Sequence, residues 1–255
     1  MTHGRFLLYL SLGAAVLTLA ATVCAAQEKP AHHWTYGGKE GPEHWGDLEQ
    51  EYATCKIGKH QSPIDIRNAK KSDLPAIQFD YHAAPLRIIN NGHSVQVNYA
   101  PGSFITVGDR RYELKQFHFH HPSEETIDGK HFEMVIHLVH ADASGNYAAV
   151  AVLVKIGAEN PAIEALWSRL PKQAGPEQKF DDVQFNASGL LPIAHGYYTY
   201  PGSLTTPPCS ENVTWLVMKE PVTISKEQAA AFARLYEHNA RPIQPLNDRT
   251  VLESK

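Results

Sequence analysis

The chain has 255 residues, 23 Lys and Arg against 27 Asp and Glu, and a formal net charge of −4. Hydrophobic residues make up 43% and charged residues 20% of it, which is ordinary for a globular protein and excludes collagen-like, coiled-coil and disordered classes. A mildly acidic chain is also a poor electrostatic match for nucleic acid. Two counts are informative, 15 His and 3 Cys, and the histidines make metal binding and proton transfer candidate functions.

Residues 1–26 have the layout of a secretory signal peptide. Arg5 precedes an apolar run over residues 6–21, and small residues follow at 25–26. We expect cleavage there, which leaves residues 27–255 as one domain that is periplasmic or secreted. An uncleaved membrane anchor and a lipid attached at Cys24 are the alternatives.

Only two cysteines, Cys55 and Cys209, remain after such a cleavage. In an exported protein one disulfide bond between them is the most economical interpretation. A buried, unpaired couple is the alternative.

Short segments with strand-like alternation dominate the rest of the chain: 86–90, 93–99, 112–120, 131–140 and 148–156. Two helices are indicated, one after the capping residue Asn160 and one after a capping box formed by Ser225 and Gln228. The pattern predicts a mainly β (α+β) fold in which a large, twisted, mostly antiparallel sheet is flanked by short helices in a single domain.

Two of these segments carry histidines in a pattern typical of a metal site. In residues 116–120 (Gln-Phe-His-Phe-His) the period of two places His118 and His120 on one face of a strand. If residues 131–140 pair with that strand as a hairpin, His137 joins them. Three imidazoles with one open position are typical of a catalytic zinc, whereas a structural zinc is closed by four protein ligands. A row of polar side chains on a solvated strand face is the alternative.

A zinc site also needs acceptors for the remaining N–H groups of its imidazoles. Gln116 shares a strand face with His118 and is one candidate. Glu124 follows the His pair and can orient a hydroxyl group. Further along, residues 203–209 read Ser-Leu-Thr-Thr-Pro-Pro-Cys, a turn that is rigid because its prolines restrict the backbone.

Eight short segments then occur in an order that is specific to one family. They are His-Trp at 33–34, Gly-Pro-Glu-His-Trp at 41–45, Gln-Ser-Pro-Ile-Asp-Ile at 61–66, Asn-Gly-His at 91–93, residues 116–120, His-Leu-Val-His at 137–140, Ser-Leu-Thr-Thr-Pro-Pro at 203–208 and Arg-Pro-Ile-Gln-Pro at 241–245. With them the chain, from about residue 32 to 249, resembles the exported bacterial branch of the α-class carbonic anhydrases.

The resemblance implies an enzyme that hydrates CO2 reversibly to bicarbonate and a proton, through attack by a zinc-bound hydroxide. It implies that His118, His120 and His137 bind Zn²⁺, that Thr205 accepts a hydrogen bond from the hydroxide and donates one to Glu124, and that His93 shuttles the proton. The other implied site residues are Val139, Leu204, Thr206, Val213 and Trp215 around CO2 and bicarbonate, Tyr36, Asn91 and Gln96 along the proton relay, and Gln116 beside a zinc ligand.

The resemblance also implies the Cys55–Cys209 disulfide and cis peptide bonds before Pro63 and Pro208. The expected partners are small molecules, CO2 and bicarbonate, for a monomer or homodimer. We expect no nucleic acid and no stable membrane association after cleavage.

At two positions the chain departs from the family pattern. Val135 stands where the family usually has a Glu that orients the third zinc ligand, and the nearest acid on that strand face is Glu133. We therefore expect faster zinc loss to a chelator than in a Val135→Glu variant. Ala149 replaces a Val of the CO2 wall, which should widen the pocket slightly.

Two other functions compete with this interpretation. A zinc peptidase needs His-Glu-x-x-His or His-x-x-Glu-His, and the nearest approach, residues 121–125, ends in Glu. A non-catalytic relative that binds or buffers zinc would typically lack a ligand His, whereas all three are present.

Overall fold

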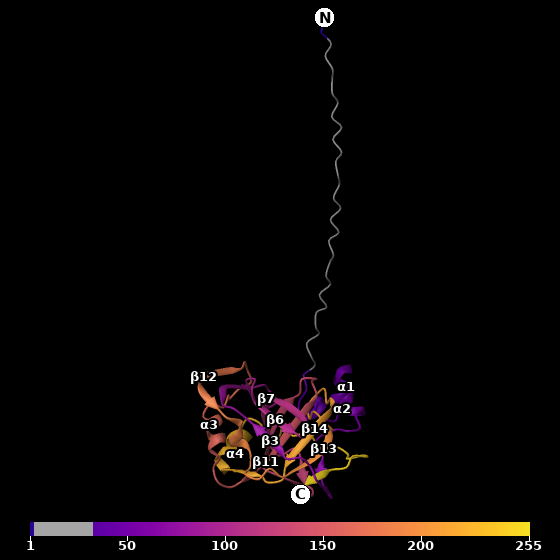
Figure 1. Ribbon diagram of the computed structural model, residues 1–255, viewed down its shortest axis with the longest axis vertical. Coiled ribbons are helices and arrows are strands. Elements are labelled where there is room, and N and C mark those ends of the chain that lie inside the picture. The colour runs from indigo at the N-terminus through magenta and orange to yellow at the C-terminus, as the bar shows by residue number, and fades with distance from the viewer. Residues whose placement is uncertain (3–32) are drawn as a thin grey trace. The chain divides into compact units, whose positions relative to one another are not determined.

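A computed structural model describes residues 1–2 and 33–255 (Figure 1). The predicted signal peptide, apart from Met1 and Thr2, and the first residues of the predicted domain lie outside the described residues. The fold is mainly β. In the described part of the chain, the strands are β1 (Asp65–Ile66), β2 (Lys70–Ser72), β3 (Ile77–Asp80), β4 (Ala84–Asn90), β5 (Val95–Asn98), β6 (Phe104–Val107), β7 (Arg110–His120), β8 (Thr126–Ile127), β9 (Lys130–His131), β10 (Met134–Ala141), β11 (Tyr147–Ile156), β12 (Gln178–Phe185), β13 (Tyr197–Ser203), β14 (Glu211–Met218), β15 (Val222–Ile224) and β16 (Leu252–Ser254).

A large mixed sheet runs through the domain in the order β12-β4-β5-β7-β10-β11-β14-β13-β16-β2, with β3, β6 and β15 attached at its sides. Most neighbours are antiparallel, as predicted, but β11 pairs parallel with β14 and β15, and β16 with β2. Parallel neighbours need a long crossover, and the chain between β11 and β14 supplies one with a helix and two other strands. A second, small sheet contains β1, β8 and β9.

The helices are short: α1 (Trp45–Leu48), α2 (Thr54–Ile57), α3 (Pro161–Trp167) and α4 (Lys226–Ala233), with 3-10 turns η1 (Gly38–Glu40), η2 (Gln50–Tyr52) and η3 (Ala187–Leu190). Both predicted caps are confirmed, because Asn160 accepts from two N–H groups of α3 and Ser225 forms the capping box of α4 with Gln228. Figure 1 places α3 and α4 together, across the view from α1 and α2. Trp167 of α3 stacks on Phe232 of α4.

The sheet separates two apolar clusters. The larger one contains Phe117, Phe119 and Leu138, which lie on the face of β7 and β10 opposite the three site histidines. His140 lies on that buried face and hydrogen-bonds the Tyr81 hydroxyl at 2.8 Å. The smaller cluster contains Val135, Leu204 and Trp215 and lies on the other face.

Two expected cis peptide bonds, Ser62–Pro63 and Pro207–Pro208, are present, and a third, His121–Pro122, was not predicted from the sequence. Among the described residues, no helix has both the length and the apolar character needed to cross a membrane.

Candidate metal centre and cavity

The pairing of β7 with β10 brings the three predicted ligands together. The two strands are antiparallel neighbours, and the register sets His137 opposite His118, with Val135 opposite His120. Each histidine offers one nitrogen, and these three atoms lie within 4.8 Å of one another. The hairpin on which the sequence prediction depended is therefore confirmed, and with it the grouping of His118, His120 and His137.

Hydrogen bonds decide which nitrogen each imidazole presents. His118 Nδ1 lies 2.8 Å from Gln116 Oε1, and His120 Nδ1 lies 2.7 Å from the backbone carbonyl of Asn239. His137 Nε2 lies 3.2 Å from the carboxylate of Glu125. All three acceptors are oxygens, so the nitrogen facing each must carry the proton. The lone pairs that face one another belong to Nε2 of His118, Nε2 of His120 and Nδ1 of His137.

The Gln116 contact agrees with its predicted role. The expectation of faster zinc loss assumed that, with Val at position 135, no acid faces His137, and that premise is wrong. A carboxylate does face His137, and it comes from Glu125 in the segment after β7 rather than from position 135. Glu133, the acid considered from the sequence, instead faces His121, with 3.5 Å between Oε1 and Nε2.

These residues fit a zinc ion. His120 Nε2 is buried and has no hydrogen-bond partner in the described part of the chain, which is costly for a polar atom unless something binds it. Burial, reinforced by the neighbouring His137, lowers the pKa of His118 to about 3 and that of His120 well below its usual value. Both imidazoles are thus neutral at pH 7, the form that binds a metal.

His137 differs, because the carboxylates beside it raise its pKa. Burial alone would lower the pKa, but the charge and hydrogen bond of Glu125 and the charge of Glu124 outweigh that effect. The cluster therefore combines two imidazoles with lowered pKa values and a third whose pKa is raised by a neighbouring carboxylate.

Glu124 is fully buried beside these imidazoles. Its Oε1 accepts from the backbone N–H of Arg241 at 2.8 Å, and its Oε2 lies 3.5 Å from His120 Nε2. Burial raises the pKa of Glu124 to about 7; the charge of Glu125 also raises it, while His137 and hydrogen bonds with Arg241 and Thr205 lower it. Glu124 and Thr205 thus lie together at the cluster.

A cavity of about 460 Å³ opens onto the cluster. His118 and His137 form part of its lining together with Thr205 and Thr206. The remaining lining residues are Lys115, Gln116, Val139, Ala141, Tyr147, Ala149, Leu204, Val213 and Trp215. The structure therefore assembles in one cavity the residues predicted for the substrate wall, and Ala149 lies among them.

The predicted relay residues His93, Tyr36, Asn91 and Gln96 are not among those lining residues, although Gln96 of β5 pairs with His118 of β7. His93 stacks face to face on Trp34, with ring centroids 3.7 Å apart. Asn91 Oδ1 accepts from the backbone N–H of His93 at 2.9 Å and so shapes the turn that carries it.

Gln96 donates to Asn98 at 2.6 Å, and the Tyr36 hydroxyl is buried without a hydrogen-bond partner among the described residues.

Asn239 is a site residue that sequence reasoning missed. Its carbonyl accepts from His120, and its Nδ2 donates to the carbonyls of His93 and Phe119 at 3.0 Å each. Its place just before the 241–245 segment was the only signal in the sequence.

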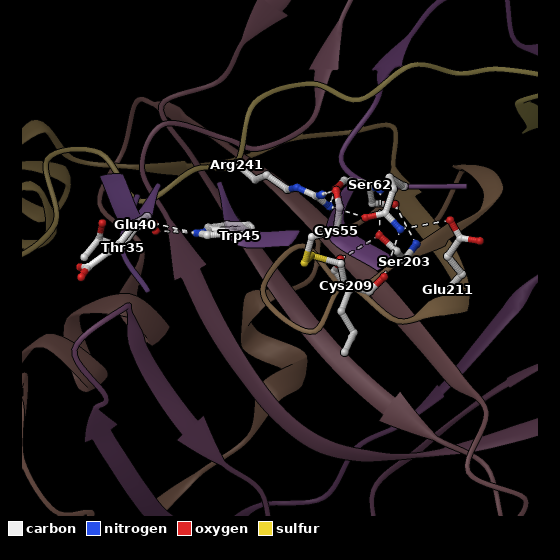
Figure 2. Close-up of a disulfide and its surroundings, with 11 residues drawn as sticks. Thr35, Glu40, Trp45, Cys55, Ser62, Ser203, Cys209, Glu211 and Arg241 are labelled. Atoms are coloured by element: carbon white, nitrogen blue, oxygen red, sulfur yellow. Dashed lines mark hydrogen bonds between the residues drawn. A yellow bond between two sulfur atoms is a disulfide. The ribbon is translucent and has the colours of Figure 1, made fainter. Parts of the chain in front are cut away.

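The predicted disulfide joins Cys55 of α2 to Cys209, which follows the Thr205 turn (Figure 2).

The same figure shows Arg241 reaching toward Ser62. The Arg241 guanidinium is buried and donates to the carbonyls of Ser62 and Cys55 at 2.8 and 3.1 Å. Ser62 and Ser203 exchange hydrogen bonds between backbone N–H and hydroxyl. The turn bearing Thr205 is thus fixed at both ends.

Comparisons with known proteins agree with this geometry. The family model described as eukaryotic-type carbonic anhydrase matches residues 40–255. A carbonic anhydrase from Nostoc sp. is 44% identical over 250 residues, which cover 95% of each chain.

Two solved structures are similar throughout the domain. One is an α-carbonic anhydrase from Thermovibrio ammonificans in complex with the inhibitor sulfanilamide, with 46% identity, a TM-score of 0.84 and coverage of 88% of this chain and 99% of that one. The other is a hyperthermostable carbonic anhydrase from an active hydrothermal vent chimney, with 50% identity, a TM-score of 0.85 and coverage of 88% and 100%. The chain therefore belongs to the α-class, or eukaryotic-type, carbonic anhydrase family of enzymes, for which reversible CO2 hydration is the characteristic reaction.

Proposed function

We propose that this chain hydrates CO2 reversibly to bicarbonate and a proton, with one zinc ion held by His118, His120 and His137. The observation that carries the proposal is the convergence of three imidazole lone pairs within 4.8 Å at a cavity of about 460 Å³. When bound, Zn²⁺ supplies a Lewis acid that makes water acidic, with a pKa of about 7 that is known from carbonic anhydrases themselves and is not a result of this structure.

Thr205 and Glu124 orient the attacking oxygen in this proposal. In this proposal the Thr205 hydroxyl donates a hydrogen bond to the buried carboxylate of Glu124, so the Thr205 oxygen can only accept a further one. A hydrogen bond from the attacking oxygen to Thr205 then fixes where that oxygen's free lone pair points. The Arg241 N–H on Glu124 Oε1 holds the carboxylate in place for this task.

The apolar part of the cavity positions CO2. Val139, Leu204, Val213 and Trp215 line the cavity next to His118 and His137. CO2 is small and carries no charge, so an apolar surface beside the ligand cluster can bind it without hydrogen-bonding groups. Thr206 in the same lining would hydrogen-bond the bicarbonate product.

His93 moves the released proton outward in this scheme. It is only half-buried, and Asn239 links its backbone to the carbonyl that orients His120. Tyr36, Asn91 and Gln96 would hold the waters between the cluster and His93.

We further propose that the mature enzyme, residues 27–255, is exported after removal of the signal peptide. The basic and apolar layout of residues 1–26 supports this, as does the Cys55–Cys209 disulfide, since disulfides persist in oxidising compartments.

The direct test is CO2 hydration by the purified protein with and without a zinc chelator, beside a His118→Ala variant. We expect activity that depends on bound zinc, is lost with the chelator, returns when zinc is added and is abolished in the variant. Zinc-loaded wild-type protein with no activity above buffer would refute the proposal.

A further inference from the structure

The carboxylate that faces His137 comes from outside its own strand. His137 Nε2 lies 3.2 Å from each of the two oxygens of Glu125. Both side chains are buried, with 1% of His137 and none of Glu125 exposed to solvent. Among the described residues Glu125 Oε1 makes no hydrogen bond, and the contact with the imidazole is what compensates this buried carboxylate.

The backbone on both sides of Glu125 is held firmly. Ser123 donates from its hydroxyl to the carbonyl of Glu125 at 2.7 Å and from its N–H to Phe132. Thr126 follows in β8, which pairs with β1, and its hydroxyl donates to Asp65 at 2.7 Å. The carboxylate is therefore presented from a fixed segment, as a residue must be to hold another side chain in one orientation.

The strand that carries His137 offers it no such partner. Val135 precedes His137 by two residues and shares its face of β10, but it is apolar and fully buried in the cluster with Ile64 and Trp215. The sequence resemblance marks this as the usual position of an orienting Glu. In this chain a carboxylate also faces the ligand, but it is supplied by Glu125 in the segment after β7 and not by the ligand's own strand.

We infer that Glu125 is a positioning residue of this enzyme, which replaces an acid at position 135. By accepting from Nε2 it fixes the tautomer and the ring of His137, so that Nδ1 points to the cluster. The inference rests on the proposed zinc site. It predicts that removing the carboxylate lowers the affinity for zinc by about 10–100-fold, the usual effect of losing such a partner.

The experiment compares zinc-loaded wild-type protein with Glu125→Gln and Glu125→Ala variants. The rate at which zinc passes to a chelator is measured, together with the absorption spectrum of the Co²⁺-substituted proteins, which reports the geometry of the ligands. Glu133→Gln is the matched control, because it makes the same change in a glutamate that faces a histidine, His121, outside the cluster.

We expect both Glu125 variants to lose zinc at least about 10-fold faster and to show altered cobalt spectra, while the control behaves as wild type. Wild-type rates and spectra in the Glu125→Gln protein would overturn the inference, as would equally fast loss from the Glu133→Gln control. The Gln variant keeps the size of the side chain, so the test does not depend on the folding of the Ala variant. A wild-type protein that binds no zinc would instead overturn the proposed function.

Discussion

The three imidazoles of the cluster differ in the nitrogen that they turn inward. His118 and His120 present Nε2, whereas His137 presents Nδ1, and in each case an oxygen acceptor on the far side of the ring sets the choice. The three acceptors are a side-chain amide, a backbone carbonyl and a carboxylate. The ring with the carboxylate is also the one whose pKa is raised.

His93 provides a residue-scale prediction about pH. Burial, together with the nearby His33, lowers the pKa of His93 below its usual 6.5. A proton relay works in hydration when its imidazole is neutral, which holds above its pKa. We therefore expect kcat for CO2 hydration to rise with pH through an apparent pKa below 6.5 and to level off above it.

A His93→Ala variant tests the same assignment. In dilute buffer kcat should fall at least about 10-fold while kcat/KM stays near the wild-type value, because only the transfer of the proton from the site to the buffer is impaired. Concentrated imidazole buffer should restore kcat. The control is His195→Ala, an exposed histidine beside Phe79. A wild-type kcat for His93→Ala in dilute buffer would refute the relay role.

How far the sequence predicts the site depends on which segments meet. The ligands follow from a two-residue alternation and one hairpin, both of which are local, and Gln116 is on the same strand as His118. Glu125 and the Asn239 carbonyl are not local to their partners, since Asn239 lies 119 residues beyond His120. The alternation of residues along a strand does not indicate which carbonyl or carboxylate, from a loop distant in sequence, will contact a given imidazole.

At the scale of elements, β7 and β10 form the frame of the site. Their register is regular from Val135 to Val139 and shifts between Val139 and His140. Apolar residues on the opposite face, such as Phe117 and Leu138, fix this register, because a slip by one residue would turn the histidines into the core. The sequence predicted residues 131–140 as one strand, whereas the chain breaks after His131 and β10 begins at Met134.

A Val135→Glu variant tests whether the two acid positions are alternatives. A second carboxylate would be buried near Glu124 and Glu125 without a partner of its own, and we expect a loss of unfolding free energy of about 3–5 kcal/mol. Combining it with Glu125→Ala should recover part of that loss, because only one acid then faces His137. Urea unfolding of the two single variants and the double variant measures this. A Val135→Glu protein as stable as wild type would contradict the account.

At the scale of the whole molecule, distant parts of the chain are tied together behind the Thr205 turn. The Cys55–Cys209 bond spans 154 residues, and closing so long a loop in the unfolded chain contributes roughly 4–5 kcal/mol in the chain-entropy picture. Arg241 adds hydrogen bonds to Gln61, Ser62 and Glu124. The disulfide was predictable from a cysteine count, but the buried arginine network was not, because a charged side chain gives no sequence signal of burial.

The most direct measurement of the central claim is a crystal structure of zinc-loaded protein with anomalous scattering at the zinc edge. The account predicts one zinc peak, with His118 Nε2, His120 Nε2 and His137 Nδ1 as its protein ligands and with Glu125 still facing His137 Nε2. Zinc bound elsewhere, or closed by a fourth protein ligand such as Glu124, would contradict it.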